Sequence, residues 1–410
     1  MSDKNNHIGF HSVQETLRKR LKEPPPTLLQ ILIGPRQVGK TTLLLELATE
    51  LGSRALYMSA DSPEAVLPDW GDLLWKRAKE LAILGPSVLF IDEVQTLPHW
   101  SRWLKSHFDQ ILKESLPLHV VVTGSSSLKL GAGSRESMAG RFEQLVLPHW
   151  GARDLIELLD VSEDNAAQKI VSFGGYPGAV RFWDDLPRWK NYLQHSIIEP
   201  AIGRDILQLE HVRKPALLRQ LFAIAAAHPA EILSLEKIAG SLAEKGALET
   251  LSHYLELLRE AFLVTPIAKY SGSEIRRRKS PPKLVLLNNA LLAAGGGGLP
   301  PTQETDPERW GRWVENACLA HAINQGENVT YWREEPWEVD GIFIGTHGNW
   351  LVEIKTGTYT ASDLRGLAQA CIKFPKLKPL VLCDPNQEEP AQAVGYTTLP
   401  WTDFLKGRWP

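Results

Sequence analysis

One eight-residue segment has the residue types and the spacing that phosphate binding requires. It is Gly34-Pro35-Arg36-Gln37-Val38-Gly39-Lys40-Thr41, which fits the pattern GxxxxGK[ST] between the apolar run ILI and the helical run TTLLLELATEL. The backbone N–H groups of such a loop, with the N-terminus of the helix, form an anion site. We expect Lys40 to reach the β- and γ-phosphates and the Thr41 hydroxyl to bind Mg²⁺, with Thr42 in the same site.

A pair of acids follows a second apolar run, and a serine follows a third. Asp92 and Glu93 end the run VLFI, and Ser125 comes directly after LHVVVTG. Beside a phosphate loop, Asp92 is expected to hold the metal and Glu93 to orient or deprotonate an attacking water. Ser125 is a candidate for contact with the γ-phosphate, but a serine-rich turn explains it equally well.

Near the C-terminus, carboxylates and a lysine are spaced for a second kind of chemistry. Side chains alternate along a strand, so Glu353 and Lys355 should point the same way, and Asp340 on a paired strand can meet Glu353. The two expected strands span residues 337–344 and 350–355. Two adjacent carboxylates can hold a divalent metal, and a nearby lysine can activate water or stabilise negative charge. Glu315, on an upstream helix, can supply a further acid.

The elements that must position these residues form three expected regions. The first alternates short apolar strands with helices, as in a parallel sheet covered by helices, and the second contains three helices followed by a hairpin, which suggests a winged helix. The third mixes helices and strands, and the Gly- and Pro-rich stretch 293–307 before it is predicted to be a linker. At about 150 residues per domain, a chain of 410 residues suits two to three domains. We expect domains at 1–150, 151–292 and 308–410.

With these motifs in order, the sequence resembles the AAA+ ATPases. It is more closely similar to a prokaryotic family that joins such a domain to a C-terminal nuclease-like domain. The resemblance rests on the motifs GPRQVGKTT, IDEVQ, TGSSS, MAGR, GGYP, EVD and EIK. It implies an α/β fold with an AAA+ parallel sheet, ATP and Mg²⁺ as cofactors, and a homo-oligomer such as a hexamer.

The same resemblance assigns roles to two further residues. Arg141 precedes the strand-like run QLVLP, where AAA+ proteins place an arginine finger that acts on a neighbouring subunit; Arg135 is a competing candidate, and a surface arginine is the alternative. Pro177, in Gly174-Gly175-Tyr176-Pro177, matches an element whose proline packs on adenine. A plain turn explains that segment too, since Gly-Gly and Pro mark turns.

The C-terminal residues resemble the PD-(D/E)xK nuclease superfamily. Glu315, Asp340, Glu353 and Lys355 all fall on its motif positions, although the proline of the named motif is absent. The resemblance implies a restriction-endonuclease-like α/β domain with metal-dependent cleavage. A nuclease fold kept only for binding, or a surface hairpin with a Glu–Lys pair, would leave the same short pattern.

A basic run suggests DNA as a partner. Arg276, Arg277, Arg278 and Lys279 are consecutive, fall at the expected wing tip, and are flanked by Lys269 and Lys283. Clustered cations without base-reading partners suit phosphates or the minor groove, although many charge runs are simply solvated loops. The formal net charge of −3 argues against a protein coated in nucleic acid but not against one that holds DNA at this loop.

The composition indicates the cellular compartment in which we expect the protein. The three cysteines, Cys318, Cys371 and Cys383, form no CxxC pair, which disfavours a disulfide framework or a zinc site. No apolar stretch approaches the roughly 20 residues that span a bilayer, and the N-terminus lacks a signal-peptide core. We therefore expect a cytoplasmic protein without a membrane partner.

Three functions fit these features. The first is an oligomeric ATPase that acts on DNA, with a Mg²⁺-dependent nuclease-like domain and Glu93, Arg141, Glu315, Asp340, Glu353 and Lys355 as catalytic residues. The second is an ATP-gated binding switch with an inert nuclease fold. The third is a helicase-like or branch-migration motor that does not cut.

Overall fold

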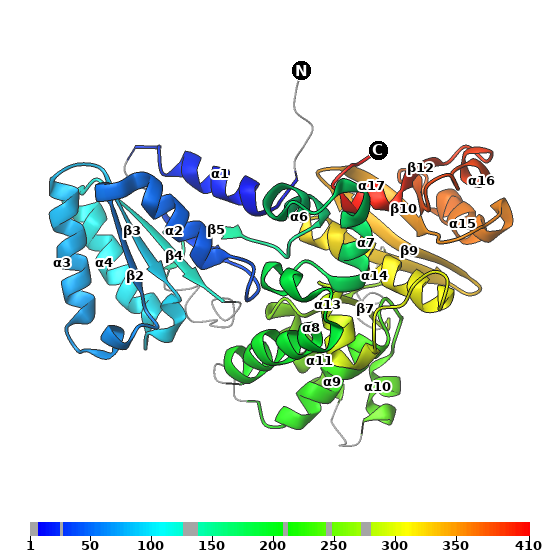
Figure 1. Ribbon diagram of the computed structural model, residues 1–410, viewed down its shortest axis with the longest axis horizontal. Coiled ribbons are helices and arrows are strands. Elements are labelled where there is room, and N and C mark those ends of the chain that lie inside the picture. Colours follow the sequence, from blue (N-terminus) through cyan, green and yellow to red (C-terminus); the bar gives the residue numbers. More distant parts are fainter. Residues whose placement is uncertain (1–6, 25–27, 126–137, 208–211, 243–247, 272–279) are drawn as a thin grey trace. The chain divides into compact units, whose positions relative to one another are not determined.

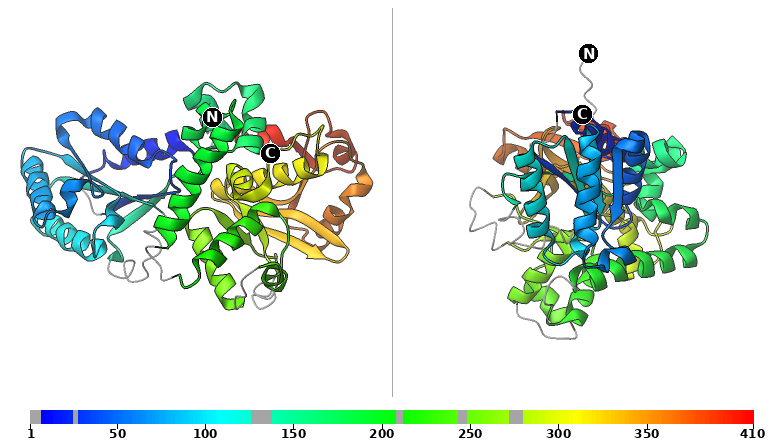
Figure 2. Two further views of the ribbon diagram at one scale, coloured as in Figure 1. Left: turned by 60° about the horizontal axis from the view of Figure 1, so that its bottom comes forward. Right: turned by 90° about the vertical axis from the view of Figure 1, so that its left-hand side faces the viewer.

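The computed structural model describes residues 7–24, 28–125, 138–207, 212–242, 248–271 and 280–410 (Figures 1 and 2). They form two compact units. The first unit covers Gly9–Pro148, and the second is built from His149–Leu207 and residues 212–410, together with His7 and Ile8. No helix within the described ranges is long and apolar enough to cross a membrane.

The first unit is built on a five-stranded sheet in the order β2-β3-β4-β1-β5, with every neighbouring pair parallel. Its strands are β1 (Leu29–Ile33), β2 (Ala55–Ser59), β3 (Ser87–Asp92), β4 (Leu118–Gly124) and β5 (Phe142–Val146); its α-helices are α1 (Phe10–Arg20), α2 (Lys40–Leu51), α3 (Trp70–Ile83) and α4 (Trp100–Glu114). The strands β1, β3 and β4 are buried along their whole length, which explains why they are continuous apolar runs in the sequence. The carboxyl ends of these three strands meet at one edge, where the phosphate loop, Asp92 and Ser125 follow them.

The second unit begins with a largely helical segment. Its α-helices are α6 (Ala152–Leu159), α7 (Glu163–Phe173), α8 (Leu186–Tyr192), α9 (Pro215–Ala227), α10 (Leu235–Ser241) and α11 (Leu248–Glu260). The antiparallel strands β6 (Val264–Ile267) and β7 (Lys283–Leu286) follow α11, in the expected order of three helices and a hairpin. The four consecutive cations, residues 276–279, lie outside the described residues.

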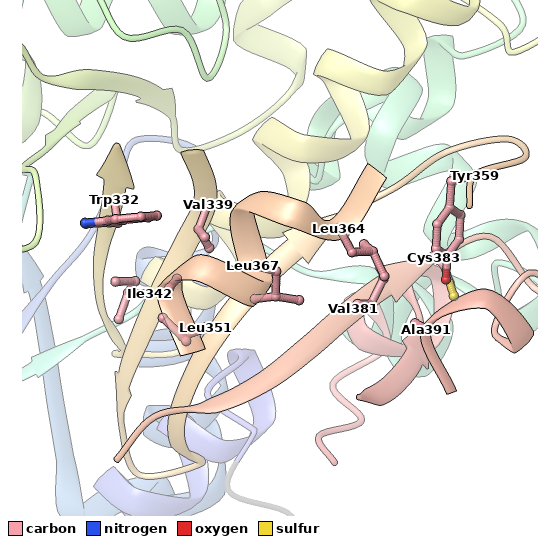
Figure 3. Close-up of a cluster of buried hydrophobic side chains, with 11 residues drawn as sticks. Trp332, Val339, Ile342, Leu351, Tyr359, Leu364, Leu367, Val381, Cys383 and Ala391 are labelled. Atoms are coloured by element: carbon pink, nitrogen blue, oxygen red, sulfur yellow. The ribbon is translucent and has the colours of Figure 1, made fainter. Parts of the chain in front are cut away.

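A mixed five-stranded sheet, in the order β12-β11-β10-β9-β8, forms the rest of the second unit. Its strands are β8 (Asn328–Glu334), β9 (Trp337–Gly345), β10 (Gly348–Ile354), β11 (Lys378–Cys383) and β12 (Thr397–Pro400), with helices α14 (Pro307–Asn324), α15 (Arg365–Lys373), α16 (Glu389–Gln392) and α17 (Trp401–Leu405). Figure 3 shows the core between α15 and this sheet, where Leu364 and Leu367 pack with Ile342, Leu351 and Val381. The sequence indicated β9, β10, α15 and β11, but not β8 or β12. All three cysteines are free, as expected.

The helical segment and the C-terminal sheet domain form one compact unit because a buried amide network joins them. Asn316 on α14 bonds the backbone N–H and carbonyl of Leu286 on β7, both at 2.9 Å, and also bonds Asn289. The predicted linker is partly packed: residues 293–297 continue the short helix α13 (Ala290–Leu292), and a Cβ on Gly295 would lie 2.4 Å from Ala226. Composition suggested a flexible stretch here, but small residues also permit close packing between helices, and this second role accounts for 293–295.

Candidate nucleotide site and candidate carboxylate site

The phosphate loop has the backbone geometry that its glycines permit. Gly39 has a φ of 94°, in the left-handed region that glycine adopts without strain, and a Cβ on Gly34 would lie 2.1 Å from the carbonyl oxygen of Leu147. Lys40 is buried, and its ammonium group donates to the carbonyl oxygens of Gly34 at 3.0 Å and Pro35 at 2.8 Å. The loop is therefore preformed, with its lysine folded back along it.

Asp92 gathers three hydroxyl groups at the end of β3. The hydroxyls of Thr41 and Tyr57 donate to its Oδ2 at 2.7 and 3.0 Å, and Thr123 donates to its Oδ1. Mg²⁺ prefers oxygen ligands, and the Thr41–Asp92 pair offers a hydroxyl and a carboxylate from the two expected motifs at one point. These residues therefore fit Mg²⁺, with Thr41 and Asp92 as the groups that would hold it; the ion would neutralise phosphate charge.

Glu93 lies directly beyond this pair in a left-handed conformation, with a φ of 52°. Its backbone N–H donates to Asp92 Oδ1 and to Thr123 Oγ1, both at 3.1 Å. The Gln95 amide nitrogen lies 3.5 Å from the Ser125 hydroxyl at the end of β4, and Ser125 is buried. Glu93 and Ser125, which come from two strands, thus lie at the same sheet edge as the phosphate loop.

The sequence analysis did not single out Tyr57 or Thr123 as parts of this site: Tyr57 belongs to no motif, and in TGSSS, which begins with Thr123, it assigned a role only to Ser125. Burial, together with the neighbouring Asp92, raises the pKa of the Tyr57 hydroxyl, which therefore stays a donor at neutral pH.

Removing this hydroxyl in Tyr57→Phe leaves one Asp92 oxygen with a single donor. We expect the Mg²⁺ concentration for half-maximal ATP turnover to change by about tenfold, in line with one hydrogen bond to a charged group. An unchanged requirement in a Mg²⁺ titration, with Tyr396→Phe as the control, would show that Tyr57 is not part of the site.

The Arg141 side chain forms an ion pair within the first unit. It precedes β5, as expected, and its guanidinium group pairs with Asp109 on α4, with Nε 2.6 Å from Oδ1. The side chain is about one-third exposed. The competing candidate Arg135 lies outside the described residues. A role for Arg141 toward another subunit would therefore require this pair to open.

The segment Gly174-Gly175-Tyr176-Pro177 belongs to the second unit, where its glycines have packing roles. A Cβ on Gly174 would lie 1.9 Å from Asn288 Oδ1, and one on Gly175 would lie 2.0 Å from the carbonyl oxygen of Trp150. Pro177 is half-buried and opens a short 3-10 helix. This packing explains the two glycines without a ligand, and contact between Pro177 and adenine stays a prediction.

The C-terminal site contains a residue from outside the C-terminal domain. Lys283 on β7 is 1% exposed, and its ammonium group lies 2.8 Å from Glu315 Oε1 and 3.2 Å from Glu338 Oε1. It also lies 3.3 Å from the backbone oxygen of Asp340 and 3.9 Å from its Oδ1. The sequence placed Lys283 beside the basic loop as a flanking cation for DNA. That expectation was wrong, because the side chain is buried among acids.

The remaining expected residues lie in the same cluster. Lys355 donates to Glu353 Oε1 at 2.8 Å, so these two side chains do point the same way, and the backbone N–H of Ile354 donates to Asp340 Oδ2 at 2.8 Å. The other Glu353 oxygen is buried without a hydrogen-bond partner among the described residues. The structure thus brings Glu315, Asp340, Glu353 and Lys355 together and adds Lys283 and Glu338.

A break in strand alternation occurs at Asp340. Thr330 on β8 pairs with Ile342 on β9, and Trp332 pairs with Val339. Two steps along β8 therefore correspond to three along β9, so β9 contains one additional residue there. Val339 and Ile342 are three positions apart, yet both pack in the core shown in Figure 3. Such bulges re-aim side chains beside functional sites. Simple alternation along 337–344 does not predict where Asp340 points.

Burial and mutual repulsion alter the ionisation of this cluster. Burial raises the pKa of Glu353 to about 8 and Asp340 adds to the shift, while Lys355 partly opposes it. Burial also raises the pKa of Glu315 to about 7, against the attraction of Lys283. For Lys283, burial lowers the pKa, but Glu315, Asp340 and Glu338 outweigh it and the net direction is upward. Lys283 is therefore a charged ammonium at neutral pH.

These residues do not fit a divalent metal as they are arranged. Glu315 Oε1 already accepts from Lys283, one Asp340 oxygen accepts from Ile354, and one Glu353 oxygen accepts from Lys355. Within the described ranges, no group of three or more His, Cys, Asp or Glu side chains is placed to hold a metal ion. The expected metal ligands Asp340 and Glu353 therefore do not form a ready site, because an N–H or ammonium group already occupies one oxygen of each.

Comparison with known families identifies the first unit. Residues 27–155 match the model of an AAA domain. The first unit therefore has the parallel-sheet fold of an AAA+ domain. Residues 165–298 and 310–404 match two further models, each described as a domain of unknown function (DUF8612 and DUF4143). The matched AAA domain contains the phosphate loop and Asp92, and the two other matches both lie within the second unit.

Two relatives of the chain match stretches of different length. The uncharacterized protein Rv2008c of Mycobacterium tuberculosis is 30% identical over 258 residues, which are 62% of this chain and 52% of that protein. The chain thus spans about half the length of this relative. The ATPase family gene 2 protein homolog B of Homo sapiens is 39% identical over 105 residues, 22% of this chain and 14% of that protein.

Solved structures resemble the chain only loosely. A variant of RuvB from Thermotoga maritima gives a TM-score of 0.34 at 21% identity, over 63% of this chain and 90% of that one. The replication initiator DnaA bound to AMPPCP and single-stranded DNA gives 0.34 at 14% identity, over 63% of this chain and 92% of that one. At these values the likeness carries no argument about function.

Proposed function

We propose that this chain is an ATP-hydrolysing AAA+ protein that acts on DNA as a homo-oligomer. The observation that carries the proposal is the joining of the two nucleotide motifs: the Thr41 hydroxyl meets the Asp92 carboxylate at 2.7 Å, beside a buried Lys40. In this proposal Lys40 binds the phosphates, Thr41 and Asp92 hold Mg²⁺, and Glu93 orients the attacking water. Ser125, at the same sheet edge, senses the γ-phosphate.

The proposal of DNA as the partner rests on the second unit. Helices α9, α10 and α11 followed by β6 and β7 match the element order of a winged helix, and residues 276–279, four consecutive cations, connect the two strands in sequence. A second group of cations in the sequence, Arg18, Lys19, Arg20 and Lys22, is partly engaged within the chain. Arg18 pairs with Glu15 and Glu50, and Arg20 pairs with Glu143. The cations of residues 276–279 are therefore the proposed phosphate contacts.

The test is ATP turnover by the full chain with and without DNA. We expect linear, single-stranded or four-way-junction DNA to raise the rate by about 5–150-fold, the usual range of coupling between two sites. This stimulation should fall as salt rises, because phosphate contacts carry the binding. Replacing residues 276–279 by alanine should remove the stimulation and leave the basal rate. Absence of turnover with every nucleic acid would refute the proposal.

A second candidate function, a switch or motor that holds DNA without cutting it, is favoured by the ammonium of Lys283 within the carboxylate cluster. In this version the C-terminal domain binds and does not cleave. The same reactions, analysed for products in the presence of Mg²⁺, separate the alternatives. Cleavage that Asp340→Ala abolishes would indicate a nuclease, strand separation without cleavage a motor, and neither product a switch.

A further inference from the structure

The carboxylate cluster of the second unit has a cation of its own. Lys283 approaches Glu315, Glu338 and the backbone oxygen of Asp340 at 2.8, 3.2 and 3.3 Å. The ammonium group donates hydrogen bonds to Glu315 and to the Asp340 carbonyl, and the Glu338 carboxylate lies within ion-pair distance. We propose that the Lys283 ammonium group is the resident cation of this cluster and excludes a divalent metal ion from it.

Charge and space both support this assignment. A metal ion binds carboxylate oxygens at about 2.0–2.6 Å, so an ion shared by Glu315 and Asp340 would lie next to the ammonium group that already contacts both. Like charges at that separation repel strongly in a buried site, where little water screens them. Glu353, the remaining acid, is paired with a second ammonium group, that of Lys355. Each acid that the nuclease resemblance assigns to metal chemistry thus has a cationic or N–H partner from the chain.

The backbone around Lys283 keeps it in this position. Lys283 pairs with Ile267 in the hairpin and forms a bridge with Ile232, and the Tyr331 hydroxyl donates to the carbonyl oxygen of Pro281 just before it. Three residues later, Leu286 exchanges two hydrogen bonds with Asn316, which neighbours Glu315 on α14. These contacts hold the backbone of Lys283 beside the cluster, so that its buried side chain reaches the acids. This placement does not depend on whether the first unit hydrolyses ATP.

The test counts Mn²⁺ ions bound to the full chain without nucleotide, by electron paramagnetic resonance of the free ion. Wild type and Asp340→Asn should bind equal numbers of ions, since the cluster binds none. Lys283→Met should gain about one ion per chain, and Lys283→Met/Asp340→Asn should lose it again. Lys283→Arg, which keeps the charge, and Lys190→Met, at an exposed lysine on α8, should match wild type.

Thermal unfolding of the same variants gives an independent readout. Removing the buried lysine leaves its acids without a cation, so we expect Lys283→Met to melt below wild type and Mn²⁺ to raise its Tm, because a ligand of the folded state stabilises it. Mn²⁺ should give wild type and Asp340→Asn the same shift. Lys283→Met/Glu315→Gln, which removes one acid with the lysine, provides a folded variant if the single substitution unfolds.

Two results would overturn the proposal. Mn²⁺ bound by wild type and lost in Asp340→Asn would show that a metal shares the cluster with Lys283. A folded Lys283→Met variant that gains no ion would show that the lysine does not take a metal's place. If Lys283→Met does not fold, the comparison of wild type with Asp340→Asn still decides whether the native cluster binds a divalent ion.

Discussion

Glu93→Gln is expected to reduce ATP turnover by about 10²–10⁴-fold while ATP still binds, which is the usual loss when a general base is removed. The side chain follows the Asp92 carboxylate, and its backbone is fixed in the left-handed region by hydrogen bonds to Asp92 and Thr123. Glutamine keeps the length of the side chain and its half-buried position but cannot accept a proton from water. The phosphate loop does not depend on Glu93, so affinity for ATP should change little.

Lys40→Ala should give the complementary result, loss of binding as well as turnover. Its buried ammonium group is the cation of the phosphate loop that the resemblance directs at the β- and γ-phosphates. Single-turnover rates and fluorescent-nucleotide binding separate the two phenotypes. Glu80→Gln, at an exposed acid on α3, is the matched control. Turnover within twofold of wild type in Glu93→Gln would remove Glu93 from the proposed chemistry, because a general base contributes far more than that.

The sequence predicted the parts of this protein that are local in the chain. The phosphate loop, β3 with Asp92 and Glu93, β4 with Ser125, and the pair Glu353–Lys355 all depend on contiguous motifs, and the structure places each at the expected end of a strand. Apolar runs predicted the parallel sheet because both of its faces are covered by helices.

Contacts between distant segments could not be predicted in the same way. The sequence around Lys283 does not distinguish it from a cation of the adjacent loop. Its burial arises because β7 lies against α14, where Asn316 is hydrogen-bonded to Leu286. The bulge at Asp340 depends on how β8 pairs with β9, and Tyr57 reaches Asp92 only through the register between β2 and β3. In each case the partner lies outside the local motif, so spacing within that motif carries no information about it.

The second large effect is expected for Arg141→Ala. If Arg141 acts as an arginine finger, this substitution should lower ATP turnover by about 10³–10⁵-fold. In the structure the guanidinium group pairs with Asp109 while about one-third exposed. Such an exposed pair contributes about 0–1 kcal/mol. A finger that contributes about 10³-fold corresponds to about 4 kcal/mol. Opening the pair therefore costs much less than the finger provides, so the Asp109 contact is compatible with a role toward a neighbouring subunit.

The two partners of this pair distinguish catalysis from structure. If Arg141 is a finger, Asp109→Ala should keep turnover at or above the wild-type rate, because it frees the guanidinium group, whereas Arg141→Ala should nearly abolish it. If the pair is only structural, both substitutions should give small and similar losses. Arg77→Ala, at an exposed arginine on α3, controls for loss of surface charge.

Mixing two inactive variants then tests action between subunits. Arg141→Ala subunits retain the phosphate loop, and Lys40→Ala subunits retain the arginine, so a mixed oligomer contains interfaces at which an intact loop faces an intact Arg141. Turnover should reappear on mixing and rise with the fraction of such interfaces, as measured by steady-state rates across mixing ratios. If the mixtures stay as inactive as either variant alone while light scattering shows that they assemble, Arg141 does not act on a neighbouring subunit's nucleotide.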